Sequence, residues 1–204
     1  MRSATHASIP LFPLHTVLFP GGPLRLRIFE PRYLDMVSRC MREDTGFGVA
    51  LIVAGREAGG TAQMVQIGTL ARIIDFEQLD DGLLGITARG ERRFRIVHVH
   101  QESDGLNVGQ VEWLDDEVRA EVQPQHAVLA ELLRRALEQI GPAYGEVTPA
   151  YEDATWVGMR LAEILPLAAV ERQELLELND GPERLHWLQS RLDIQESRDE
   201  EPDS

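Results

Sequence analysis

Two histidines and a group of arginines are the residues in this sequence whose spacing could support binding chemistry. His98 and His100 lie two residues apart in an alternating stretch, so a strand would place both imidazoles on one face. A zinc site needs at least a third ligand, but the one cysteine, Cys40, lies far away in the sequence and no carboxylate pattern adjoins the pair. We therefore expect no metal and no cofactor, and interpret both histidines as solvent-facing or partly packed.

The arginines follow a turn signal and surround one aromatic residue. Arg89, Arg92, Arg93 and Arg95 flank Phe94 in a stretch that predicts a hairpin. Arginine binds phosphate and an aromatic ring can stack on a base, so RNA is one candidate ligand. The alternative is that the arginines pair with acidic groups of the same chain or of a partner protein.

The distribution of charge favours that alternative. Residues 1–110 contain 12 arginines and 12 acidic residues, whereas residues 111–204 contain 8 arginines and 22 acidic residues, a formal charge of −14. The acidic half should repel nucleic acid and anionic lipid. Nucleic acid is therefore not the partner we expect, although RNA binding by the arginine hairpin remains the alternative function.

Every basic residue other than histidine is an arginine, and this excludes two kinds of catalytic site. A nucleotide-binding P-loop requires a lysine that contacts the phosphates. A Ser–Lys dyad requires an amine that loses its proton near neutral pH, which arginine does not do. The carboxylate clusters at Asp80–Asp81 and Asp115–Glu117 lie at expected turns or boundaries. We expect no enzymatic activity.

The first 115 residues read as strands with one helix. Prolines and glycines interrupt residues 9–33, and a helix opens at Pro31 and continues over Arg32–Arg42. The other segments are a flexible connection at Gly55–Ala62, turns at Pro20–Gly22, Asp80–Gly82 and Gly90–Glu91, and strands at Ile9–Leu14, Pro23–Phe29, Phe47–Ala54, Met64–Leu79, Leu83–Ala88, Arg93–Val99 and Leu106–Trp113. The alternation by itself indicates only a meandering antiparallel sheet.

Residues 116–192 change to helical periodicity. Leucine-rich stripes and the positions of proline and glycine predict four helices, over Pro124–Ile140, Asp153–Leu165, Ala168–Leu178 and Pro182–Leu192. The last segment, residues 193–204, is acidic and polar, and we expect it to be disordered. The sequence therefore predicts an α+β fold in which a β-rich subdomain, residues 1–115, precedes a helical bundle, residues 116–192.

The order and spacing of several motifs resemble one known family, the N-terminal substrate-binding domain of Lon proteases. The motifs are PLFPL at Pro10–Leu14, LFPG at Leu18–Gly21, LRIFEPRY at Leu26–Tyr33, IGTLARI at Ile67–Ile73, GERRFRI at Gly90–Ile96, LAEILPL at Leu161–Leu167 and ERQELLEL at Glu171–Leu178. Lon proteases also carry an ATPase and a Ser–Lys peptidase module, and neither is found in this sequence. The resemblance is to a stand-alone, non-catalytic member.

The resemblance implies a PUA-like β pseudobarrel before the helical bundle, and a function in binding unfolded polypeptide or a partner protein. The candidate binding residues are Leu18 and Phe19, in the proline-bounded loop, with Arg32 and Tyr33 beside them; their alternative role is core packing. The lone cysteine suits a reducing compartment, and no apolar run could span a bilayer, so we expect a cytoplasmic monomer or homodimer.

Overall fold

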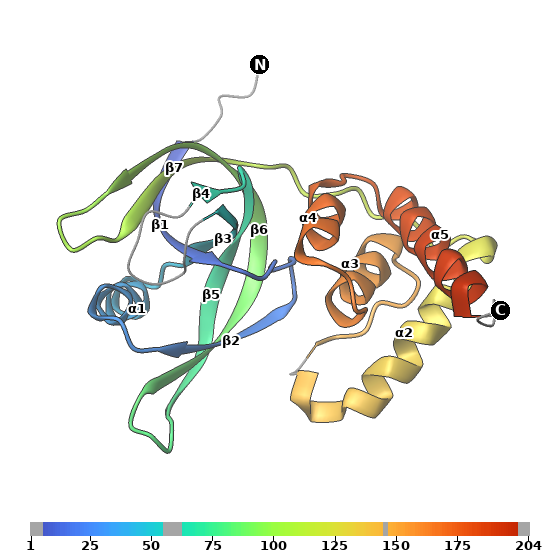
Figure 1. Cartoon of the computed structure of the whole chain (residues 1–204), viewed down its shortest axis with the longest axis horizontal. Coiled ribbons are helices and arrows are strands. Elements are labelled where there is room, and N and C mark those ends of the chain that lie inside the picture. Colours follow the sequence, from blue (N-terminus) through green and yellow to red (C-terminus); the bar gives the residue numbers. More distant parts are fainter. Residues whose placement is uncertain (1–5, 55–62, 145–146, 200–204) are drawn as a thin grey trace. The chain divides into compact units, whose positions relative to one another are not determined.

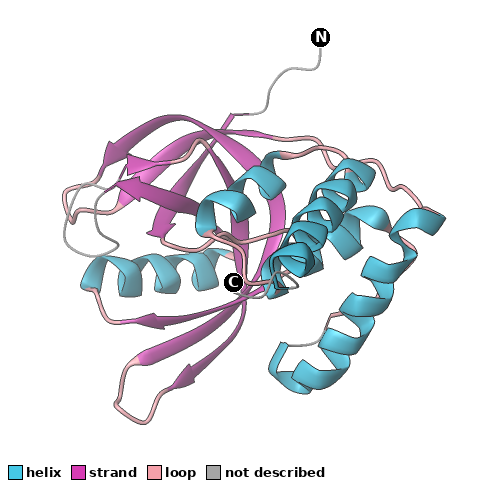
Figure 2. Cartoon of the chain, turned by 45° about the vertical axis from the view of Figure 1, so that its right-hand side comes forward, coloured by secondary structure: helices cyan, strands magenta, loops and turns pink. Residues whose placement is uncertain are grey.

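The computed structural model describes residues 6–54, 63–144 and 147–199 of the 204-residue chain. The chain divides into two compact units, Met1–Asp116 and Glu117–Ser204. Strands and one helix, α1, form the first unit, and the helices α2 to α5 belong to the second (Figure 2). The fold is therefore a mixed α+β fold. The expected connection at Gly55–Ala62 lies outside the described residues.

A seven-stranded sheet forms the first unit. Its strands are β1 (His6–Leu14), β2 (Pro23–Ile28), β3 (Phe47–Ala54), β4 (Gln63–Met64), β5 (Ile67–Gln78), β6 (Leu84–Gln101) and β7 (Asn107–Trp113). They pair in the order β1-β7-β6-β5-β3-β4, and β2 pairs with β6 (Figure 1). The long predicted strand at Met64–Leu79 is divided into β4 and β5, and the ladder irregularities of β5 follow Thr69 and Ile73 rather than Gly68.

The first strand, β1, has two partners, and this differs from a simple meander. It pairs antiparallel with β7, where Leu11 lies opposite Asn107, and parallel with β3, where Leu11 lies opposite Gly48. A parallel pair joins segments that no hairpin connects. Alternation within each strand carries no information on such a partner, so the β1–β3 pair could not be predicted from local pattern.

The strand β6 corrects one sequence-based prediction. A turn was expected at Gly90–Glu91, but β6 continues through both residues to Gln101. The Gly90 N–H donates to the carbonyl of Gly22 at 2.9 Å, and the Gly90 carbonyl accepts from the N–H of Gly21 at 2.8 Å. A Cβ at Gly90 would lie 2.2 Å from the Phe19 carbonyl oxygen. The glycine is needed because another segment of backbone approaches closely.

The helix α1 (Pro31–Glu43) closes one side of the core of this unit. Proline occupies its first turn, where the missing N–H costs no hydrogen bond. Tyr33 stacks on Phe12 with 3.9 Å between the ring centroids, and Met36, Val37 and Cys40 follow it on the buried face. Met41, the next residue along the helix, is 42% exposed. It lies about 100° around the helix from Cys40, at the edge of the stripe.

The second unit is helical. It consists of two short 3₁₀ helices, Pro124–His126 and Gly141–Tyr144, and four α-helices, α2 (Ala127–Ile140), α3 (Ala154–Ile164), α4 (Ala169–Glu177) and α5 (Gly181–Asp199). The helix α5 continues past Leu192 to Asp199, within the segment that was expected to be disordered. Residues 195–198 are Gln, Glu, Ser and Arg, most of which favour helix, and the next proline is Pro202. Residues 200–204 lie outside the described residues.

A buried ion pair lies inside the second unit. Arg184 on α5 is fully buried, and two of its nitrogens bind the Glu117 carboxylate at 2.7 and 2.9 Å. Its guanidinium also donates to the carbonyls of Leu175 and Leu178, at 2.8 and 2.6 Å. A Cβ on Gly158 would lie 3.0 Å from the Arg184 Cδ atom. The arginine therefore joins three segments of the unit.

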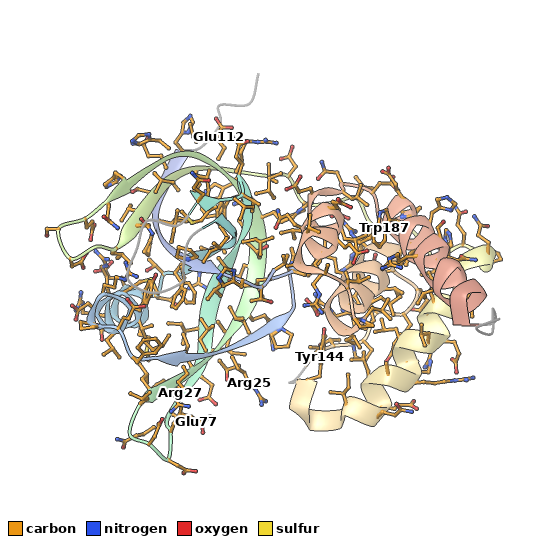
Figure 3. All side chains as sticks on the ribbon, viewed as in Figure 1. Arg25, Arg27, Glu77, Glu112, Tyr144 and Trp187 are labelled. Carbon is orange, nitrogen blue, oxygen red and sulfur yellow. The ribbon has the colours of Figure 1, made fainter. Side chains whose placement is uncertain are left out.

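Glu163 on α3 is a second buried carboxyl in this unit. Its carboxylate accepts a hydrogen bond from the Tyr144 hydroxyl and another, at 2.7 Å, from Arg160 Nη2. Burial raises the pKa of Glu163 to about 7, from an ordinary value of 4.5. Tyr144 (Figure 3) is itself largely removed from solvent, which raises the pKa of its hydroxyl.

The raised pKa of Glu163 predicts a pH-dependent stability. Between about pH 4.5 and 7 the folded chain binds more protons at this group than the unfolded chain does. The contribution of Glu163 to the free energy of unfolding should therefore fall as pH rises through this window. The Glu163→Gln variant lacks the titrating group, so its stability relative to the natural protein should increase between pH 5 and pH 7. Urea denaturation at several pH values measures this difference, and a difference independent of pH would contradict the assignment.

Candidate functional site

The four residues predicted to bind polypeptide are buried. Leu18 is 4%, Arg32 9% and Tyr33 3% exposed, and Phe19 has no exposed surface. Leu18 and Tyr33 belong to the same apolar cluster of the first unit. The expectation that these side chains form an exposed binding surface is therefore corrected to their alternative role in packing. Phe19 is held by its loop, because the Gly22 N–H donates to its carbonyl at 3.0 Å.

Arg32 positions the loop that precedes β7. Its Nη1 donates to the Gly105 carbonyl at 2.8 Å, and its Nη2 lies 3.0 Å from Glu30 Oε2. The guanidinium also lies over the Tyr33 ring, 4.7 Å from the centroid. These contacts within the chain explain why an arginine is largely buried at the strand-to-helix joint, and no ligand is needed to explain it.

The arginine cluster lies on one continuous strand, β6, rather than on a hairpin. Arg89, Arg92 and Arg95 are exposed, but Arg93 is 4% exposed and Phe94 is fully buried. Phe94 packs edge-on to Trp113 with 6.4 Å between centroids, and the guanidinium of Arg92 lies 4.7 Å from the centroid of the same tryptophan ring. A base therefore finds no free aromatic face at Phe94, and the structure does not favour RNA binding here.

His98 and His100 are both exposed on β6, opposite Gln110 and Val108 of β7. Among the residues that the structure describes, no three His, Cys, Asp or Glu side chains are grouped closely enough to hold a metal ion. One carboxylate of each cluster pairs with an arginine instead. Asp81 pairs with Arg27 near the turn, and Glu117 binds Arg184.

A groove beside the C-terminal end of α1 is the candidate site that the geometry provides. Two adjoining hollows, of about 420 and 220 Å³, share Cys40, Asp44, Thr45 and Arg72, and together we call them the α1–β5 groove. The larger hollow has an apolar wall that includes Ile9, Pro10, Leu70, Val108 and Trp113. The smaller hollow is lined by Met41 and by the segment of β5 from Ile73 to Phe76.

The turn that ends α1 shapes this groove. Asp44 has a φ of 50°, in the left-handed region, and the Thr45 N–H donates to the Cys40 carbonyl at 2.9 Å. A Cβ on Gly46 would lie 2.6 Å from the Ala71 carbonyl oxygen, so only glycine allows this close passage between α1 and β3. The turn is thereby fixed against β5.

Arg72 lines both hollows and pairs with two carboxylates. Its Nε donates to Glu91 at 2.7 Å, and its Nη1 donates to the carboxylate and the carbonyl of Asp44 at 2.9 and 2.8 Å. The hydrogen bond with Glu91 is the main cause of a raised pKa for Arg72, so the guanidinium stays charged. The charged residues that line the two hollows are two arginines and four carboxylates, Arg39, Arg72, Glu43, Asp44, Asp75 and Glu102, so the lining has a negative formal charge.

Cys40 lies in the floor of both hollows, and its environment does not activate it. The side chain is 1% exposed, and the thiol donates to the Gly46 carbonyl at 3.5 Å. Burial raises the pKa of the thiol, which disfavours the nucleophilic thiolate. Cys40 therefore acts as a small core residue that closes the groove from below.

Large apolar side chains remain exposed around the smaller hollow. Met41 is 42%, Ile74 50% and Phe76 58% exposed. The register places Phe76 beside Ile86, which belongs to the core cluster, whereas Glu77 lies across from Arg27 on the other, polar face (Figure 3). Among the described residues, β5 pairs with β3 only as far as Ala71, so its later residues have β6 as their partner on one side.

These groove residues were not found by the sequence analysis. Ile74 and Phe76 alternate with Asp75 and Glu77 in IIDFEQ, which is the pattern of any half-buried strand. Only the ladder shows that β3 stops before this segment and leaves it at an edge. The helical pattern of α1 places Met41 with the apolar stripe, so its exposure could not be predicted either.

Comparison with known proteins identifies the family. Residues 8–193 match the family model described as the ATP-dependent protease La (LON) substrate-binding domain. Curated relatives include Lon protease 2 of Myxococcus xanthus, 28% identical over 87% of this chain and 22% of the relative, and protein cereblon of Danio rerio, 28% identical over 54% of this chain and 26% of the relative. The chain thus spans about a quarter or less of the length of these relatives.

Two solved structures share the fold. The Lon N-terminal domain protein from Xanthomonas campestris is 41% identical, with a TM-score of 0.76 over 90% of this chain and 98% of that one. The N-terminal domain of Mycobacterium avium complex Lon protease is 19% identical, with a TM-score of 0.63 over 89% of this chain and 96% of that one. Together with the match over residues 8–193, these findings show that the chain belongs to the LON substrate-binding domain family.

Proposed function

We propose that this chain is a non-enzymatic recognition module that binds unfolded or extended polypeptide in the α1–β5 groove. The observation that carries the proposal is the group of exposed apolar side chains, Met41, Ile74 and Phe76, around a hollow at the edge of β5. Clustered exposed apolar residues beside a concave surface are typical of protein-binding sites. Membership of a substrate-binding domain family supports the same function.

The lining of the groove suits a polypeptide of a definite composition. Its apolar walls would take aliphatic or aromatic side chains, since burying them supplies most of the favourable free energy. The carboxylates of its lining outnumber the arginines, and this excess of negative charge would attract arginine or lysine and repel acidic segments. We infer a preference for apolar segments flanked by basic residues, which only an unfolded chain exposes.

We also infer that the sheet of the first unit corresponds to a PUA-like pseudobarrel. The pairing of β1 with both β7 and β3 supports this, because the series of strand pairings that starts at β1 returns to β1.

No described helix is both long and apolar enough to cross a bilayer. A reducing, cytoplasmic compartment is proposed from the free thiol of the single cysteine, Cys40.

The proposal predicts which exposed residues affect binding. We expect a reduced and alkylated, permanently unfolded protein to bind the natural chain, and the same protein in its native form to bind much more weakly. The double variant Ile74→Ser/Phe76→Ser should bind the unfolded probe at least about tenfold more weakly, because each side chain contributes on the order of 1 kcal/mol or more of apolar contact. Fluorescence anisotropy with a labelled probe measures both affinities.

A matched control distinguishes the site from general surface hydrophobicity. Val97 on β6 is 53% exposed and does not line the groove, so Val97→Ser should leave the affinity unchanged. Equal weakening by Val97→Ser would show that binding is not localised to the groove. No binding of unfolded probe by the natural chain would remove the proposed function itself.

A further inference from the structure

The helix α2 carries one broad apolar stripe, of which only a part is covered within its unit. Leu129 and Leu133 are 2% and 0% exposed and face the interior of the helical unit. Other residues of the stripe, Val128, Leu132 and Ile140, are 64%, 39% and 37% exposed. The apolar stripe of α2 is therefore wider than the part that its own unit buries, and the exposed residues require a separate explanation.

The exposed set lies along a single row of the helix. Leu132 follows Val128 by four residues, and Ile140 follows Leu132 by eight. Ala136, which is half-buried, lies midway between Leu132 and Ile140 in the same row. We call these four residues the α2 ridge. Rows of this spacing are the ridges that interdigitate when two helices pack at a crossing angle near −50°. The small Ala136 leaves room for a large side chain from a facing helix.

Charges beside the α2 ridge are balanced, unlike those of the surrounding sequence. Residues 111–204 carry a formal charge of −14, but α2 contains two glutamates and two arginines, Glu131, Arg134, Arg135 and Glu138. Glu131 accepts from Arg135 Nε at 2.9 Å and lies 3.5 Å from Arg134 Nε. Residues 111–204 of two copies of the chain repel each other because both are acidic. The helix α2 is locally neutral, and its mixed charges can pair with those of a second α2, so two copies could associate there.

We propose that the α2 ridge is a self-association surface, on which a second copy of this chain packs its own α2 in the antiparallel direction. A twofold axis near Arg134 then places Val128 opposite Ile140 and Leu132 opposite Ala136 of the second copy. The same symmetry brings Glu131 of each copy toward Arg135 of the other. The small area of one helix pair predicts a weak, concentration-dependent dimer.

Sedimentation velocity over a wide range of protein concentration tests this surface. The natural chain should pass from monomer to dimer, and Leu132→Glu should raise the dissociation constant at least tenfold, because a buried unpaired carboxylate is costly. Val170→Glu is the matched control: Val170 is 62% exposed on α4, outside the ridge, and its replacement should leave the dissociation constant unchanged. Circular dichroism verifies that the variants remain folded.

Charge exchange and cross-linking test the direction of packing. Arg135→Glu alone and Glu131→Arg alone should weaken the dimer, and the double variant E131R/R135E should restore it. A mixture of Val128→Cys and Ile140→Cys proteins should form a mixed disulfide, which a parallel arrangement would not allow. A chain that stays monomeric at every concentration, or a Leu132→Glu dimer as tight as the natural one, would overturn the proposal. Disulfides formed within each single-cysteine population would overturn the antiparallel arrangement.

Discussion

Replacing Arg184 by methionine should destabilise the helical unit by about 3–5 kcal/mol, the usual cost of removing one partner of a buried ion pair. The substitution leaves the Glu117 side chain, which is 3% exposed, as a charge without its guanidinium partner. It also removes the donors that bind the carbonyls of Leu175 and Leu178. Urea denaturation followed by circular dichroism measures the loss in the free energy of unfolding.

Two further variants separate this effect from the loss of any arginine. Arg191 binds Glu171 at 2.8 Å, but the two side chains are 30% and 21% exposed, so Arg191→Met should cost about 1 kcal/mol or less. Combining Arg184→Met with Glu117→Gln should recover part of the stability, because the stranded carboxylate is then neutral. A cost for Arg184→Met similar to that for Arg191→Met would show that Glu117 is solvated without its partner.

The Phe19→Ala variant should lose about 3–5 kcal/mol of stability, since a fully buried aromatic ring is removed and leaves a cavity. If Phe19 lay in an exposed binding loop, the same substitution would cost less than about 1 kcal/mol of stability. The comparison is with Phe76→Ala, at a phenylalanine that is 58% exposed in the α1–β5 groove. We expect that variant to keep nearly all of its stability and to weaken polypeptide binding.

Measuring stability and binding in the same proteins tests both assignments. Tyr33→Ala should cost roughly 3 kcal/mol through the lost stacking on Phe12, and should resemble Phe19→Ala rather than Phe76→Ala. If Phe19→Ala were stable and impaired only in binding, the loop at Leu18–Phe19 would return as the recognition site.

The local elements could be predicted because their patterns are local. The apolar run Phe47–Ala54 became β3 with the expected bounds, and Pro31 opens α1 as its position predicted. The family prediction depended on the order and spacing of motifs along the whole chain, and the match over residues 8–193 confirms it. In each case the information resides in neighbouring residues or in their order.

What could not be predicted depends on segments distant in the sequence. Gly90 permits the close approach of Phe19, but a glycine among polar residues also fits a turn. The groove exists because β3 ends its pairing at Ala71, which no feature of IIDFEQ reveals. Arg184 precedes the buried Leu185 on α5, but its own burial depends on pairing with Glu117, which lies 67 residues earlier in the sequence. Periodicity assigns a side chain to a face, and only the partner decides what that face touches.

The double pairing of β1 has a consequence for how the protein is made. The chain is synthesised from its N-terminus at about 5–20 residues per second, so β1 emerges some 5–20 s before its antiparallel partner β7 is complete. Until then the edge of β1 that pairs with β7 has no backbone hydrogen-bonding partner. This strand carries the apolar residues Ile9 and Leu11. Pairing of β1 with β7 is therefore a late, long-range step, which slows folding and leaves the nascent chain open to chaperones or to pairing with another chain.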